Sequence, residues 1–170
     1  MNKKYFLPFI AVIFLAACNN STDSSTTADS TDKKMAEDTA HHMNTMSTDV
    51  PELPAVPEGA SVHFKNLKNN ATVSSPVKVE MEVAKMRVDT TGPVVAGSGH
   101  FHIFVDAEDS IATGAIVPKD STHLHYGKAQ TSADVPLSAG KHKLTLQFAD
   151  GLHRSYGNKL ATTITVNVKK

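Results

Sequence analysis

Hydrophobic and polar residues alternate along four stretches of the chain after residue 60. The clearest stretch runs from Val77 to Val83, where every second residue is apolar and the residues between are Lys or Glu. A period of two residues is typical of a β-strand with one buried face. The alternation therefore predicts four half-buried strands, at residues 62–64, 77–83, 144–148 and 164–168.

Three further stretches have strand composition without a clean alternation. Residues 100–106 are apolar at both odd and even positions, which predicts a central strand buried on both faces. Residues 111–117 and 122–126 lie between turn residues and are expected to form short strands. The longest irregular stretch, 86–99, contains several glycines and is a candidate functional loop.

No stretch shows a helical period, so the pattern predicts an all-β fold. Several short antiparallel strands over about 110 residues favour an immunoglobulin-like antiparallel β-sandwich of about seven strands. A closed barrel is the alternative. The chain has one cysteine, so no internal disulfide can form and the apolar core must stabilise the domain.

Composition divides the chain into a signal peptide (1–17), a tether (18–56) and the β-sandwich domain (57–170). The tether is rich in Ser, Thr and Asp, with two lysines against seven acids, and has too few large apolar residues to fold. We expect a disordered linker with a span of about 35 Å. The domain has thirteen basic residues against ten acids, spread along the strands, which argues against a nucleic-acid partner.

The first eighteen residues have the organisation of an export signal. Lys3 and Lys4 precede an apolar run from Tyr5 to Ala16, and small residues lead into Cys18. The run is shorter than the eighteen or more residues of a spanning helix, which disfavours the alternative of a transmembrane anchor. The segment is therefore expected to direct export.

The sequence Leu15-Ala16-Ala17-Cys18 resembles the bacterial lipobox. The resemblance implies that Cys18 carries diacylglycerol, that residues 1–17 are removed, and that the new N-terminus is acylated with a fatty acid such as palmitate. Two or more acyl chains give stable membrane anchoring; the alternative is a free cysteine at the end of an ordinary signal peptide. Asn19, where aspartate would signal inner-membrane retention, favours the outer membrane. The domain is then expected in the periplasm or at the cell surface, with the membrane as its partner through the lipid.

Four of the nine histidines form two His-x-His pairs, His100 with His102 and His123 with His125. Residues i and i+2 of a strand point to the same face, about 6.6 Å apart. Two such pairs on neighbouring strands would bring four imidazoles to one ion, and imidazole suits copper and zinc. The pairs therefore predict a transition-metal site.

His142 and His153 are further candidate ligands, because His142 has the core-facing parity of its strand and His153 lies in the turn that follows. Acids that would orient ligating imidazoles are near in sequence at positions 106, 120 and 150. In the alternative, the histidines are buried structural groups bonded to the backbone and to one another. His63 has outward parity and is expected at the surface.

In the tether, residues 41–46 (HHMNTM) suit a soft copper ion. So short a segment also fits incidental residues of a linker with biased composition.

The motifs of common enzyme classes are absent from the sequence. It has no Gly-x-Ser-x-Gly elbow, no His-Glu-x-x-His and no Walker loop. We therefore expect a non-catalytic protein. Two functions stay open: a metal-binding envelope domain, and a structural or protein-interaction module of the envelope whose histidines are only structural.

Three segments of the domain resemble the bacterial domain of unknown function 4399 family. They are a Gly-His-x-His-aliphatic strand at 99–106, a His-x-His-aromatic-Gly-Lys-x-Gln-Thr segment at 123–131, and a Gly-x-His-x-Leu strand at 140–150, followed by His153. The resemblance spans nearly all of 57–170 and implies an exported β-sandwich without a settled activity. Ala129 stands where the family pattern leads us to expect glycine.

Overall fold

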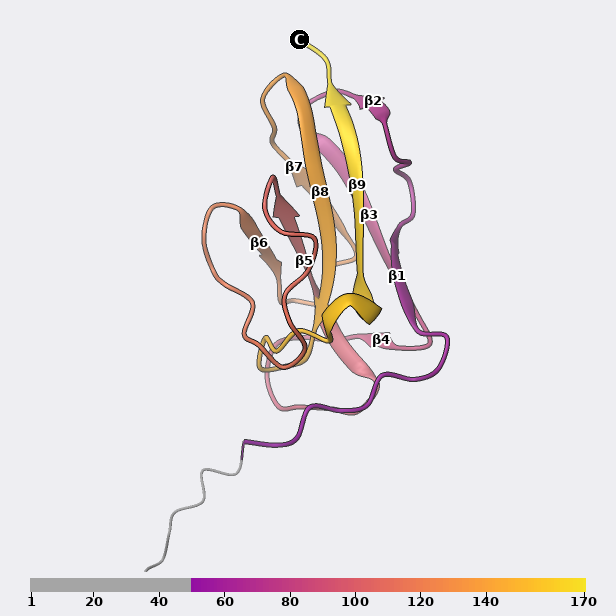
Figure 1. The fold of residues 1–170 in the computed structure, drawn as a ribbon, viewed down its shortest axis with the longest axis vertical. Coiled ribbons are helices and arrows are strands. Elements are labelled where there is room, and N and C mark those ends of the chain that lie inside the picture. Colours follow the sequence, from indigo (N-terminus) through magenta and orange to yellow (C-terminus); the bar gives the residue numbers. More distant parts are fainter. Residues whose placement is uncertain (1–49) are drawn as a thin grey trace, which may run out of the picture. The chain divides into compact units, whose positions relative to one another are not determined.

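The computed structural model describes residues 50–170, which fold into two β-sheets (Figure 1). The smaller sheet has the strand order β1 (Ser61–Phe64), β3 (Val77–Ala84) and β7 (Ser132–Val135). The larger sheet has the order β2 (Ala71–Val73), β9 (Ala161–Val168), β8 (Gly140–Ala149), β5 (Ser98–Val105) and β4 (Arg87–Val88), and β6 (His123–Tyr126) also pairs with β5. A short 3₁₀ helix, η1 (Gly157–Leu160), precedes β9.

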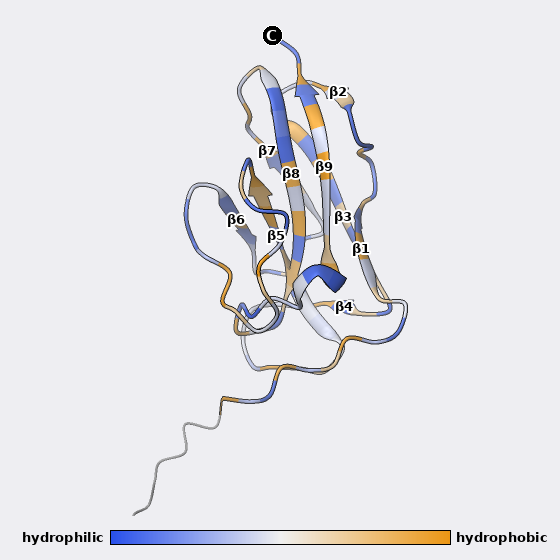
Figure 2. Cartoon of the chain, in the orientation of Figure 1, coloured by the Kyte–Doolittle hydropathy of each residue, from blue (hydrophilic) through white to orange (hydrophobic). Residues whose placement is uncertain are grey.

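The predicted all-β sandwich of immunoglobulin-like type is confirmed. Strands β1, β3, β8 and β9 form where the alternation predicts them, and bands of opposite hydropathy follow one another along β9 (Figure 2). In β3 the first six residues alternate between buried and exposed. Because the described strands form two sheets and not one continuous sheet, the structure is a sandwich and not the closed barrel.

The structure differs from the predicted strands in three respects. The strand predicted at 111–117 is wrong: this stretch is irregular and makes only an isolated bridge between Ile116 and Arg154. Strands β2, β4 and β7, which have three, two and four residues, are not among the predicted strands. The pairs β2–β9 and β4–β5 are parallel, where antiparallel pairing was expected throughout.

The hydrophobic core contains side chains from both sheets. Phe101 and Phe148 are fully buried at its centre, with ring centroids 5.0 Å apart in an edge-to-face arrangement. The β1–β3–β7 sheet contributes Val62, Phe64, Val77, Val79, Met81 and Val135, and the larger sheet contributes Phe101, Ile103, Leu144, Leu146, Phe148, Val166 and Val168.

The other face of the larger sheet is covered by the loop between β5 and β6. Phe104 and Ala149 of the sheet form a second buried cluster with Val117 of the loop. Gln147 links this loop to the sheet, because its Oε1 accepts a hydrogen bond from the backbone N–H of Ile111 at 3.2 Å. Residues 98–104 of β5 are consequently all buried, which confirms the predicted central strand.

Residues 50–56, the described end of the predicted tether, form a strap against the domain. Leu53 and Val56 pack on the core, and Arg154 Nη1 donates a hydrogen bond to the carbonyl of Pro51 at 2.6 Å.

The signal peptide, Cys18 and the histidine–methionine segment at 41–46 lie outside the described residues. Within residues 50–170, no helix is both long and apolar enough to cross a membrane.

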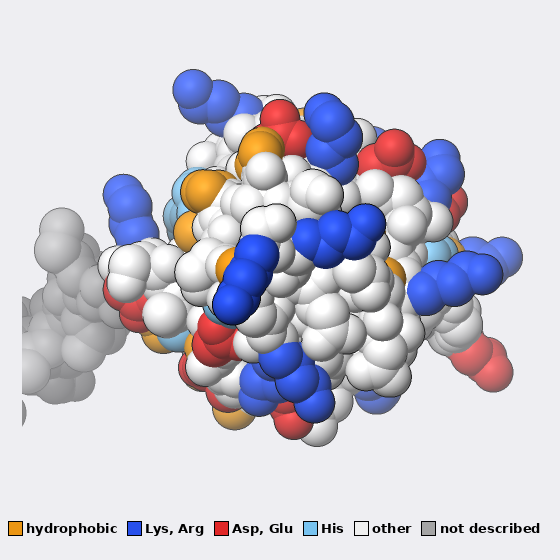
Figure 3. All heavy atoms as spheres, turned by 90° about the horizontal axis from the view of Figure 1, so that it is seen from above, with side chains coloured by type: hydrophobic (Ala, Val, Ile, Leu, Met, Phe, Trp, Pro, Cys, Tyr) orange, Lys and Arg blue, Asp and Glu red, His pale blue; other side chains and the backbone are white. Residues whose placement is uncertain are grey.

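The face of the molecule drawn in Figure 3 carries charges of both signs. Lys and Arg side chains are spread over it, with Asp and Glu side chains between them. Mixed charge of this kind keeps a surface hydrated without creating a field of one sign.

Candidate metal centre

Strand register brings histidines of β5 and β6 together on the outer face of the larger sheet. His102 lies directly opposite His125 in the antiparallel β5–β6 pair. His100 is two residues before His102 on β5, so the period of two places it on the same face. These three residues each offer a ring nitrogen, and the three nitrogens lie within 4.8 Å of one another.

A fourth ring, that of His153, reaches the same place from the turn after β8. His153 has a φ of 66°, in the left-handed region that few non-glycine residues adopt. The turn is held by Asp150, which is fully buried and whose Oδ1 accepts hydrogen bonds from the backbone N–H groups of Leu152 (2.9 Å) and Arg154 (2.8 Å). Arg154 Nε donates to Asp150 Oδ2 at 2.7 Å, which closes the turn.

The four rings form one compact group, which we call the histidine cluster (His100, His102, His125 and His153). Ring centroids in the cluster are 4.8–5.9 Å apart. The Nε2 atoms of His100 and His102 are 3.0 Å apart, and those of His125 and His153 are 3.2 Å apart. In a tetrahedral site with Zn–N bonds of about 2.0–2.1 Å, neighbouring ligand nitrogens are about 3.3 Å apart. Both close pairs thus have nearly the spacing of two ligands on one ion.

The cluster is half enclosed. His100 and His102 are 0% and 1% exposed, whereas His125 and His153 are in contact with solvent. A pocket of about 270 Å³ opens over them, lined by Thr91, His102, Val117, Pro118, Lys119, His125 and His153. An ion can therefore reach the ring nitrogens from outside.

Burial keeps the inner rings uncharged at neutral pH. The pKa of His100 is lowered to about 4, chiefly by burial and then by the neighbouring rings of His153 and His125. The pKa of His102 falls to about 2, chiefly through burial and then through His100. The pKa of His125 is also lowered, by burial and by His153. Neutral imidazole is the form that binds metal, so these rings are available as ligands.

The contacts of the cluster match only one part of the structural alternative, because the rings bond one another but not the backbone. Among the described residues, no ring of the cluster bonds a backbone carbonyl, and the Nδ1 atoms of His100 and His102 have no hydrogen-bond partner. When one Nε2 donates to the other, the accepting ring carries its proton on Nδ1. That buried N–H is left unsatisfied, which is unusual in a folded protein.

His123, the fourth predicted ligand, lies apart from the cluster. It shares the outer face but stands opposite Phe104, two residue pairs further along the strands, and its ring packs on that of Phe104 with centroids 4.6 Å apart. Its Nδ1 is 2.8 Å from Asp120 and its Nε2 is 3.2 Å from Glu108. Burial lowers the pKa of His123, but these two carboxylates outweigh it and raise the pKa above its usual value. Both ring nitrogens of His123 are thus paired with carboxylates.

His142 and His63 are also placed away from the cluster. His142 lies near the start of β8, at the end opposite Ala149, which pairs with His100. Its Nδ1 is 2.7 Å from Asp106, and its Nε2 is 3.0 Å from the carbonyl of Ser138. His63 is exposed, as expected from its parity, and lies 3.5 Å from Glu82.

The acids expected to orient the ligands have different roles. Asp106 and Asp120 bond His142 and His123, which are outside the cluster. Asp150 acts through the turn that presents His153. Lys119, at the edge of the pocket, was not considered from the sequence, because nothing in the pattern brings an isolated loop lysine close to His125.

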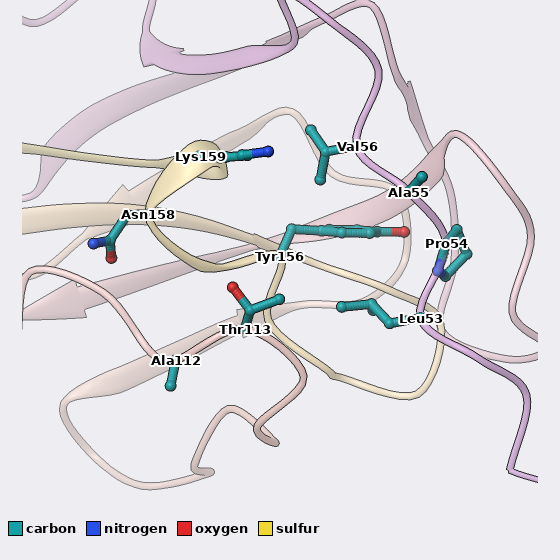
Figure 4. A pocket seen from close by; sticks show the side chains of 9 residues that line it. All are labelled: Leu53, Pro54, Ala55, Val56, Ala112, Thr113, Tyr156, Asn158 and Lys159. Atoms are coloured by element: carbon teal, nitrogen blue, oxygen red, sulfur yellow. The ribbon is translucent and has the colours of Figure 1, made fainter.

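A larger pocket, of about 540 Å³, lies beneath the strap (Figure 4). The ring of Tyr156 lies between strap residues Leu53 and Val56, with Thr113 beside it. Tyr156 is a structural residue here, because its hydroxyl donates a 2.8 Å hydrogen bond to the carbonyl of Ser98 and burial raises its pKa to about 12.

Comparison with known proteins gives one match. The profile of a family described as a domain of unknown function (DUF4399) matches residues 79–169, which is more than half of the chain and includes every histidine of the cluster. No curated protein and no solved structure matches the chain.

Proposed function

This chain belongs to the DUF4399 family of domains of unknown function, and we propose from the geometry of its histidine cluster that it binds a transition-metal ion. His100, His102 and His125 would be the ligands, and His153 lies beside them, with its Nε2 3.2 Å from that of His125. The observation that carries the proposal is that ring nitrogens of these three histidines lie within 4.8 Å of one another. An all-imidazole set suits copper and zinc, so these are the proposed ions.

The protonation of the cluster supports the proposal. Because the pKa of His100 is about 4 and that of His102 about 2, an ion binding at pH 7 displaces no proton from either ring. The half-open arrangement supports it as well, because two ligands are held rigidly in the sheet while His125 and His153 face the solvent. We propose a binding protein and not an enzyme.

Calorimetric titration tests the proposal. The full chain, purified in mild detergent and carrying H41Q and H42Q so that the tether cannot compete, is titrated with Zn²⁺ and with Cu²⁺. We expect one ion per chain to bind more tightly than about 10 μM. Adding H100Q and H102Q removes two ligands and should abolish this binding.

H63Q and H142Q are the matched controls, because each removes a histidine that lies away from the cluster; both should bind like the parent. The proposal fails if no ion binds more tightly than about 10 μM, or if the variant lacking His100 and His102 binds equally well. A purely structural role predicts that this variant loses stability and that metal affinity is never present.

We also propose that the domain works in the cell envelope, tethered by lipid on Cys18. The support is the lipobox-like sequence after a short apolar run. Cells expressing the protein and fed radioactive palmitate should label it, and Cys18→Ala should lose the label. Equal labelling of the two proteins would refute the anchor and leave the metal proposal untouched.

A further inference from the structure

The pocket over the histidine cluster has more room than a metal ion needs. Its volume is about 270 Å³, whereas a water molecule occupies about 30 Å³ in the liquid. His102, His125 and His153 line it, and the remaining wall is formed by Thr91, Val117, Pro118 and Lys119. A small molecule can therefore stand next to an ion held by the cluster.

The ligand set leaves the charge of a bound ion uncompensated. The ligands and the neighbouring ring of His153 are all imidazoles, which contribute no negative charge. The carboxylate of Asp150 acts on His100, but it already pairs with Arg154, whose Nη2 is 2.7 Å from Oδ2. The other nearby acids, Glu108 and Asp120, are paired with His123. A divalent ion in the cluster thus makes the pocket strongly positive.

Lys119 adds a second positive charge at the same place. It lines the pocket together with three of the clustered rings, and its ammonium group helps to lower the pKa of His125. A positive side chain would not favour metal binding by itself, because like charges repel. Its position is explained if the occupant of the pocket carries a negative charge.

We infer that the metal ion of the histidine cluster keeps an open coordination position and binds a small anion there, between the ion and Lys119. The inference rests on the proposed metal-binding function. Three imidazoles plus an exchangeable position is a common arrangement in zinc proteins, and His100, His102 and His125 are enough to supply the three. The ligand class is a small inorganic anion or a carboxylate.

Azide is the probe that tests this inference on the full chain carrying H41Q and H42Q. The protein is loaded with Cu²⁺, freed of excess ion, and its retained copper is measured by electron paramagnetic resonance. Azide is then added while the azide-to-copper charge-transfer absorption is followed. We expect a saturable band, with affinity about threefold to tenfold lower in K119Q and near the parent value in K119R.

K159Q is the control, because Lys159 is an exposed lysine that lines a different pocket; it should bind azide like the parent. If the chain retains no copper, or if H100Q and H102Q retain as much as the parent, the proposed function itself has failed. If copper is retained but azide gives no band, only the anion site is refuted. Equal weakening in K119Q and K159Q would also overturn the role of Lys119.

Discussion

Histidines of this domain fall into two groups that differ in their partners. The rings of the cluster contact one another, and no carboxylate of the described residues bonds them. His123 and His142 instead bond Asp120 and Asp106. A carboxylate next to an imidazole favours the charged ring, whereas burial among other rings favours the neutral one. The pKa is thus lowered in His100, His102 and His125 and raised in His123.

The lowered pKa values of His100 and His102 predict how the metal-free protein responds to acid. Both folded-state values, about 4 and about 2, lie below the value near 6.5 expected in the unfolded chain. As the pH falls below 6.5, the unfolded chain therefore takes up protons first and the free energy of unfolding decreases. The loss should be up to roughly 1.4 kcal/mol per pH unit for each of the two histidines.

Urea unfolding of the metal-free chain at pH 7, 6 and 5 measures this loss. H102Q should show a shallower decline, because one of the two rings can no longer take up a proton in the unfolded state. H123Q provides the contrast: His123 has a raised pKa, so its contribution is present at low pH and is lost as the pH rises through the folded value. Stability that is constant or increases from pH 7 to pH 5 would contradict the neutral cluster.

At the scale of elements, close backbone approaches decide where the rings lie. A Cβ atom on Gly127 would lie 2.3 Å from His125 Nε2 and 2.5 Å from Thr91 Cγ2. A Cβ atom on Gly99 would lie 2.2 Å from the carbonyl oxygen of Ala149, so β5 and β8 can pair next to His100 only because this residue is glycine. Residues without side chains therefore shape the cluster.

Gly127→Ala should displace the ring of His125 while leaving most of the fold in place, because the nearest obstacles are ends of side chains and not backbone. We expect a loss of metal affinity of about tenfold to a hundredfold, the usual cost of disturbing the support of a ligand. Gly114→Ala is the control: it lies in open space with a φ of 81°, so it should lower the melting temperature without changing metal affinity. Parallel effects of the two substitutions on affinity would contradict the account.

The sequence predicted elements well where one face is buried and the other is wet. That is why β3, with its alternating burial, was found and the two-residue β4 was not. The stretch 111–117 misled for a physical reason: Ile111 and Val117 are apolar because they cover Phe104 and Ala149 as a loop, and burial by a loop needs no strand. Apolar content without alternation therefore cannot distinguish a buried strand from a loop that covers the sheet.

At the scale of the whole molecule, the cluster lies on the outer face of the larger sheet and not between the sheets. The inter-sheet core holds Phe101, Ile103 and Phe148, while the rings of His100 and His102 point the other way. An ion can therefore bind without repacking of the core. The loop between β5 and β6 and the turn after β8 complete the site around a rigid sheet.

The candidate site could be predicted from the sequence only in part. The period of two correctly places His100 and His102 on one face, and it also places His123 and His125 on one face. Which rings meet depends on the register that sets His102 opposite His125, and on a left-handed turn that brings in His153. Neither the register nor the turn conformation is visible in residue spacing, so His123 was grouped with rings that it does not contact.

A crystal structure of the full chain soaked with zinc, with anomalous differences recorded at the zinc absorption edge, shows whether the histidine cluster binds the ion. The account predicts one strong peak in the histidine cluster, about 2.0–2.1 Å from Nε2 of His100, His102 and His125, with His153 alongside. No peak in the cluster at saturating zinc, or a peak held instead by His123, Asp120 and Glu108, would contradict it.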